Sequence, residues 1–149
     1  SMEAKKRYGL KKIIWAITKK NPFKNKSYLD LKKRIKLAKK ISLKNKFIKV
    51  RFFESKIKSN KTVDLISHLK KKGKSTEIYF IMGADNLINF HKWHRWNEIA
   101  SKSILLVFNR GKYKTKSLKS ITYKKYNNLR LKFINFKKIN ISSSKLRNI

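Results

Sequence analysis

This chain of 149 residues has no cysteine, and it has little acid, glycine or proline. Without cysteine it can form no disulfide framework, no thiolate metal site and no cysteine nucleophile. Only 7 residues are Asp or Glu, and neither a Ser-His-Asp triad nor a carboxylate pair can be placed among them. With 4 glycines and 1 proline there is no flexible linker. We therefore predict a single domain over residues 3–149, with residues 1–2 a cloning remnant or a start site.

Long hydrophobic runs are also missing. The longest runs, such as residues 13–17 and 104–108, fall far short of the roughly 20 residues that cross a membrane. No signal peptide is recognisable, because Glu3 and a basic cluster precede only a short apolar stretch. Hydrophobic residues nevertheless make up 40% of the chain, which is enough to build a core. We expect a cytoplasmic globular protein that has no membrane partner.

The charge is almost entirely of one sign, with 42 Lys and Arg giving a formal net charge of +35. One interpretation is a protein that binds polyanions, since each neutralised phosphate releases counterions. The other is the codon usage of an A/T-rich genome, because most of the basic residues are Lys and they are spread along the whole chain. Readers of nucleic acid favour Arg, whose planar fork matches guanine edges and phosphates. The charge alone names no function, and adhesion to nucleic acid stays open.

Short runs with high strand propensity alternate with helical patterns along the chain. This alternation is typical of stacked βα units. We therefore predict the α/β class with a mostly parallel sheet. Strands are expected over residues 13–18, 47–53, 77–82, 103–109 and 131–136, and helices over 27–41 (with Ser27 as the cap), 62–72 and 87–100.

Two motifs suggest chemistry that their surroundings do not support. Residues 73–75 read Gly-Lys-Ser, but a phosphate-binding loop needs a glycine five residues earlier, where His68 stands. It also needs a strand before it and a helix after it, and here that order is reversed. His91 and His94 have the spacing of metal ligands on a helix, but a zinc site needs a third protein ligand. Contacts with polar substrate or with solvent explain them better.

The most informative stretch reads IYFIMGADNLINFHKWHRW. A buried strand ends at Gly83, where the missing side chain allows a ligand close to the backbone. Asp85 then falls at the carboxyl edge of the sheet, where open α/β folds bind ligands. Trp93, on the helix expected next, offers a flat face to an aromatic ring. Phe90 and Trp96 are better explained as core residues.

A second informative stretch, ISSSKLR, lies near the end of the chain at residues 141–147. Three hydroxyl side chains followed by Lys145 and Arg147 are typical of a helix N-terminus that binds phosphate. The alternative is a frayed polar tail.

Four segments together carry a resemblance to a known family. They read WAITKKNPFK (15–24), MGADNLINFHKWHRWNEIA (82–100), VFNRGKY (107–113) and ISSSKLR (141–147). The chain resembles the bacterial nicotinate-nucleotide adenylyltransferases of the nucleotidyltransferase superfamily, which implies a Rossmann-like three-layer α/β/α fold. The family usually has Arg-Pro-Gly where this chain has Arg110-Gly111, and Ser144 stands in place of a threonine.

The resemblance implies transfer of AMP from ATP to nicotinate mononucleotide in NAD biosynthesis, with Mg²⁺ carried on the phosphates of ATP. It implies that Trp93 stacks on the nicotinate ring, that Thr62 helps to hold the carboxylate through its backbone, and that Lys24 lies near the mononucleotide phosphate. It further implies that the ATP ribose and adenine contact Gly83 and Asp85, and that the triphosphate contacts Ser142, Ser144 and Arg147. It carries over no catalytic residue and no protein ligand for a metal.

Two departures from the family concern its binding sites. The family begins with a strand and a Gly-x-Phe-x-Pro-x-His-x-Gly-His loop that binds the ATP phosphates, whereas this chain begins within the helix that follows. We expect that strand and loop to be missing here, the strand being the central one between the Trp15 and Phe80 strands. Lys61 also replaces the tyrosine that is frequent beside Thr62. Three hypotheses stay open: an enzyme that has lost its first segment, a degraded pseudoenzyme, and a small basic nucleic-acid-binding protein.

Overall fold

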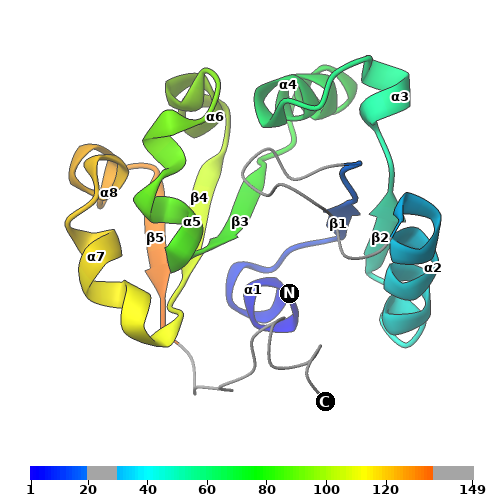
Figure 1. Ribbon diagram of the computed structural model, residues 1–149, viewed down its shortest axis with the longest axis horizontal. Helices are drawn as coiled ribbons and strands as arrows, with labels where there is room; N and C mark the ends of the chain where they lie inside the picture. Colours follow the sequence, from blue (N-terminus) through cyan, green and yellow to red (C-terminus); the bar gives the residue numbers. More distant parts are fainter. Residues whose placement is uncertain (20–29, 136–149) are drawn as a thin grey trace. The chain divides into compact units, whose positions relative to one another are not determined.

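The computed structural model describes residues 1–19 and 30–135 (Figure 1). Contacts divide the chain into two units, residues 1–68 and 69–149, and each is described by itself. The first unit contains α1 (Met2–Tyr8), β1 (Ile13–Ala16), α2 (Leu31–Ser42), β2 (Ile48–Arg51), α3 (Glu54–Ile57) and the start of α4 (Thr62–Lys72).

In the first unit, β1 and β2 pair in parallel, with Ile13 opposite Ile48. Ile48 and Val50 of β2 are buried while the residues that alternate with them are exposed, so one face of this strand is in the core. The helix α2 packs against β2. A parallel pair requires a crossover between its strands, and α2 lies on that crossover.

The helix α2 differs from its prediction at its start and on its faces. It begins at Leu31, and its N-cap is Asp30, whose Oδ1 accepts a hydrogen bond from the Lys33 backbone N–H at 2.7 Å. Asp30 satisfies a helix donor, which makes it the cap in place of Ser27, a residue outside the described part. Ala38 is buried, whereas Leu37 and Ile41 are 48% and 58% exposed.

The second unit contains three strands in the order β3-β4-β5, all parallel (Figure 1). Leu105, Leu106 and Val107 of the central strand β4 are 0% exposed. Since successive side chains of a strand point to opposite faces, both faces of β4 are covered. The elements are β3 (Tyr79–Gly83), α5 (Ala84–Ile88), η1 (Phe90–Lys92), α6 (Trp96–Lys102), β4 (Ile104–Phe108), η2 (Gly111–Tyr113), α7 (Lys114–Leu118), α8 (Ile121–Tyr126) and β5 (Leu131–Ile134).

The prediction of one continuous helix over residues 87–100 is wrong. The segment is divided into the end of α5, the 3₁₀ turn η1 and α6. Trp93 has extended backbone (φ −74°, ψ 145°) and Arg95 a positive φ of 50°, so Trp93 lies between helices. The break has a packing reason: Phe90 is fully buried while the Trp93 ring turns onto Phe90 and Phe80.

The α/β class and the parallel pairing of the strands are confirmed, and all five predicted strands are present. The helix predicted over residues 62–72 is confirmed as α4, with Val63 and Ile66 buried. β1 pairs with β2 alone and β3 with β4 alone, so no strand in the described part of the chain pairs with both β1 and β3. The central strand, the three-layer arrangement and the single domain stay predictions.

The carboxylate of Glu98 in α6 gives a pH-dependent contribution to stability. Lys102 Nζ lies 2.5 Å from Glu98 Oε1, and Arg95 pairs with Oε2. The hydrogen bond from Lys102 and the charges of Arg95 and Lys102 lower the pKa of Glu98, and its partial desolvation opposes them less strongly. A lowered pKa in the folded state means stability that is present above the unfolded value of about 4.3 and is lost as the pH falls through the folded pKa.

We therefore expect Glu98→Gln to unfold at lower urea concentration than the native chain at pH 7, and the gap to close as the pH falls below about 4. Urea midpoints at steps between pH 3 and 7 measure this. A gap that is constant over that range would contradict the ion-pair explanation. High salt should narrow the gap at pH 7, because these charges are partly exposed to solvent.

Candidate functional site

Gly83, Asp85 and Arg110 lie together at the carboxyl edge of the β3-β4 pair. Gly83 ends β3 and is the N-cap of α5, with extended backbone (φ −81°, ψ 157°). Asp85 follows in the first turn of α5. Gly83 is opposite Phe108, the last residue of β4, and Arg110 comes two residues later. The prediction that Asp85 stands at this edge is confirmed in its position.

Gly83 leaves the space beside its backbone to two charged side chains. A Cβ on Gly83 would lie 2.4 Å from Asp85 Oδ1 and 3.1 Å from both Cδ and Nε of Arg110. Because these atoms all belong to side chains, a larger residue at position 83 would push the Asp85 carboxylate and the Arg110 side chain aside. The predicted contact of Gly83 with a ligand stays a prediction.

The charges at this edge are only partly paired. Arg110 Nη1 lies 3.5 Å from Asp85 Oδ2 in an ion pair that is partly open to solvent. Asp85 Oδ1 is shielded from solvent and has no hydrogen-bond partner among the described residues, and the same is true of Asn109 Oδ1. A shielded acceptor without a donor is costly, so these two oxygens are places where a ligand can donate.

Trp93 lies between η1 and α6 and packs against two aromatic rings. Its ring centroid is 5.1 Å from that of Phe90 and 6.0 Å from that of Phe80. Phe90 is 0% exposed, so its predicted place in the core is confirmed. Trp96 is half-buried and packs edge-on against Phe90 and Tyr126. Trp93 is also half-buried, which leaves part of its ring surface accessible.

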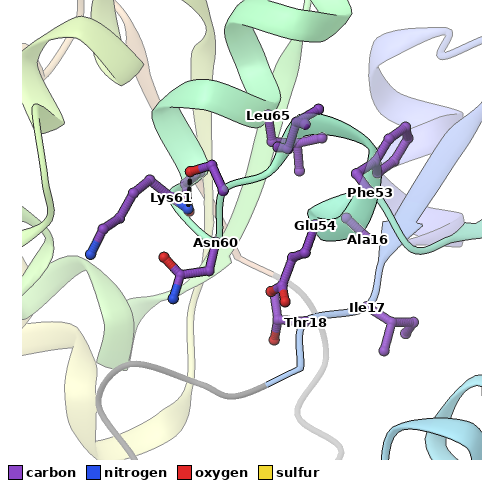
Figure 2. Close-up of a pocket in the computed structure, with 11 residues that line it drawn as sticks. Ala16, Ile17, Thr18, Phe53, Glu54, Asn60, Lys61 and Leu65 are labelled. Carbon is purple, nitrogen blue, oxygen red and sulfur yellow. Dashed lines mark hydrogen bonds between the residues drawn. The ribbon is translucent and has the colours of Figure 1, made fainter.

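A small pocket lies in the first unit, after the ends of β1 and β2 and at the start of α4. Its volume is about 40 Å³, enough for a carboxylate-sized group and far too little for a nucleotide. Thr18, Glu54, Asn60 and Thr62 are among its lining residues. Figure 2 shows the Glu54 side chain beside Thr18, while the Lys61 side chain extends away from them.

Hydrogen bonds hold the two polar walls of this pocket. Both oxygens of Glu54 accept from the Lys19 backbone N–H at 3.1 Å, which partly satisfies the only carboxylate in the lining. Ser59 Oγ donates to Asp64 Oδ2 at 2.6 Å and accepts from the Lys61 N–H at 3.1 Å. Thr62 is the first residue of α4, where helix N–H groups have no partner within the helix. Thr62 thus stands at a positively polarised end of a helix.

The other predicted site residues are distributed as follows. Lys24, Ser142, Ser144 and Arg147 lie outside the described residues. His91 is in η1 and His94 in the following turn, so they do not share a helix. The described residues hold no group of three His, Cys, Asp or Glu placed to bind a metal ion.

None of the described helices is long and apolar enough to span a membrane. Sequence reasoning gave no role to Arg110, although its place just after a buried strand was a usable signal.

Comparison with known proteins identifies the family to which the chain belongs. The model of the family described as cytidylyltransferase-like matches residues 2–149. The chain is 66% identical over all 149 residues to a "Probable nicotinate-nucleotide adenylyltransferase" of Pelagibacter ubique (strain HTCC1062), covering 82% of that protein. A protein of the same name from Rhizobium meliloti (strain 1021) is 33% identical over 108 residues, which are 72% of this chain and 57% of the relative.

A solved structure shares the fold. The Plasmodium falciparum nicotinic acid mononucleotide adenylyltransferase complexed with NaAD superposes with a TM-score of 0.69 at 20% identity, over 99% of this chain and 74% of that one. The Rossmann-like fold implied by the resemblance is therefore confirmed. This chain accordingly belongs to the cytidylyltransferase-like family, among the nicotinate-nucleotide adenylyltransferases.

Proposed function

We propose that this chain transfers the adenylyl group of ATP to nicotinate mononucleotide, giving deamido-NAD and pyrophosphate in NAD biosynthesis. The observation that carries the proposal is 66% identity along the whole chain to a probable enzyme of this name. A fold match across 99% of the chain to an adenylyltransferase structure supports it. From these substrates and this reaction we infer a location in the cytoplasm.

Trp93 is the residue we assign to the nicotinate ring. Its indole is half-buried and rests on Phe90 and Phe80, so it is held before any ligand arrives. A ring whose orientation is already fixed loses little entropy when a second ring stacks on it. Lys24 is assigned to the mononucleotide phosphate by the resemblance alone.

The nicotinate carboxylate is assigned to the start of α4. The pocket there is of carboxylate size, and the positively polarised start of a helix attracts anions. Thr62 contributes its backbone, and Lys61 adds a positive charge where the family frequently has tyrosine. Glu54 opposes an anion, but the Lys19 N–H already engages its carboxylate.

ATP is assigned to the edge formed by Gly83 and Asp85, with the triphosphate held by Ser142, Ser144 and Arg147. The phosphate oxygen of the mononucleotide attacks the α-phosphorus of ATP in line, the bond to the β-phosphate oxygen breaks, and pyrophosphate leaves. Mg²⁺ enters as part of the substrate on the ATP phosphates. Little covalent work falls to the protein, so positioning and charge neutralisation supply most of the rate.

The test measures binding and turnover on the full chain. Nicotinate mononucleotide is titrated while tryptophan fluorescence is followed, and deamido-NAD formation with Mg²⁺ and ATP is quantified by chromatography. We expect saturable quenching and product, with nicotinamide mononucleotide as the comparison substrate. Binding without any product would favour the degraded pseudoenzyme, and absence of both would overturn the proposal.

A nucleic-acid-binding protein is the second candidate, favoured by the net charge of +35. Duplex DNA titrated at two salt concentrations distinguishes the two functions. Tight binding with log K falling by about 0.9 per phosphate contacted, and no response to the mononucleotide, would favour that candidate. Weak DNA adhesion beside normal turnover would mark the lysines as incidental to function.

A further inference from the structure

We propose that Arg110 is a positioning residue that holds the Asp85 carboxylate so that its Oδ1 accepts a hydrogen bond from the bound nucleotide. The inference rests on the proposed function, which assigns Asp85 to the ribose and adenine side of ATP. It adds a role for Arg110, a residue to which the sequence analysis gave none. A nucleoside offers the hydrogen-bond donors that Asp85 Oδ1 would accept from, namely ribose hydroxyls or an exocyclic amino group.

The first support is steric. Asp85 and Arg110 come from different strand ends, β3 through α5 and β4 through its following loop, and both lie over the Cα of Gly83. Asp85 Oδ1 would be 2.4 Å and the Arg110 Nε 3.1 Å from a Cβ at Gly83. Two side chains therefore share the space that one glycine leaves free, and each limits the positions open to the other.

The second support is that the two carboxylate oxygens of Asp85 have different surroundings. Oδ2 faces Arg110 Nη1 at 3.5 Å, whereas Oδ1 is shielded from solvent and has no partner in the described part of the chain. An ionised carboxylate only accepts hydrogen bonds, and a guanidinium only donates. In this arrangement Arg110 contacts Oδ2 alone, so Oδ1 stays available to a hydrogen-bond donor of the nucleotide.

The competing explanation is that Arg110 contacts the nucleotide phosphates directly, since its side chain is largely exposed. The two roles differ in their dependence on Asp85. A positioning residue acts through the carboxylate, so its removal matters only while Asp85 is present. A phosphate contact would keep its effect in a chain that has lost Asp85, because independent contacts add.

The experiment measures the Kd of a non-hydrolysable ATP analogue by calorimetry, and KM for each substrate, in Arg110→Ala, Arg110→Lys, Asp85→Ala and the double variant Asp85→Ala/Arg110→Ala. We expect Arg110→Ala to raise the Kd about tenfold and leave KM for nicotinate mononucleotide unchanged, because a displaced carboxylate costs binding at one substrate only. Arg110→Lys should restore most of the affinity. The double variant should bind no more weakly than Asp85→Ala alone.

Lys112→Ala is the matched control, since it removes one positive charge from the same loop, where Lys112 lies over Tyr113. Its Kd should equal that of the native chain, and all variants should melt at similar temperatures because exposed ion pairs contribute little to stability. The positioning role would be overturned if the double variant bound the analogue more weakly than Asp85→Ala, or if Arg110→Ala bound it as tightly as the native chain does. Normal turnover by the native chain would in that case leave the proposed function intact. A native chain that neither binds the analogue nor forms product would overturn both the positioning role and the proposed function.

Discussion

Phe90→Ala is expected to lower the free energy of unfolding by about 3–5 kcal/mol, the range for truncating a buried phenylalanine. Phe90 is 0% exposed, and its ring lies 5.1 Å from Trp93 and 6.3 Å from both Phe80 and Trp96. Removing it leaves a cavity beneath Trp93 and takes away three aromatic contacts together. Urea unfolding followed by far-UV circular dichroism measures the change.

Leu129→Ala is the matched control for this truncation. Leu129 is 74% exposed, so the same kind of change should shift the free energy of unfolding by less than about 0.5 kcal/mol. A cost below about 1 kcal/mol for Phe90→Ala would show that the aromatic cluster is not a core, and the structural basis for holding Trp93 would fail with it.

Trp93→Ala is expected to weaken binding of nicotinate mononucleotide by roughly 5- to 150-fold, which corresponds to a stacking contribution of about 1–3 kcal/mol. The indole is half-buried and packs on Phe90 and Phe80, which hold it in position for a ligand ring. Calorimetry is the suitable measurement, because the substitution removes the tryptophan whose fluorescence the ligand is expected to quench. Trp93→Phe keeps an aromatic face and should recover most of the affinity.

Trp96 provides the comparison for this prediction. It is also a half-buried tryptophan, but its ring packs edge-on against Tyr126 and lies 5.2 Å from Lys125 Nζ. We expect Trp96→Phe to leave the affinity for the mononucleotide unchanged. If Trp96→Phe lost as much affinity for the mononucleotide as Trp93→Ala, then Trp93 would act on the fold and not on the ligand. Affinity for an ATP analogue should be unaffected in both variants.

The strands were predictable because their signal is local. The run that became β4 consists of five apolar residues between polar ones, and burial on both faces of a parallel strand requires such a run. The helix α4 was predictable because Val63 and Ile66 repeat at helical spacing and Gly73 follows its end. In both cases the apolar residues that form the pattern in the sequence are the residues that are buried in the structure.

The elements that sequence reasoning missed depend on tertiary contacts. The break at Trp93 contains neither glycine nor proline, and it forms because Phe90 and Trp93 pack on the same Phe80. Helices of four to six residues, such as α3 and α8, are too short to show a period. The pairing of Arg110 with Asp85 joins residues 25 positions apart, and no local pattern encodes it.

Every strand pairing described here is parallel, and this bears on how fast the chain reaches its native state. Partner strands lie roughly 25 to 35 residues apart along the chain, and no described pair of strands forms a hairpin that could nucleate early. Such non-local pairings pay loop-closure entropy before they gain contacts, which slows folding. Until the pairs form, the strand edges are open to other chains. Refolding yield should therefore fall as protein concentration rises, and dilute conditions should favour recovery of the native state.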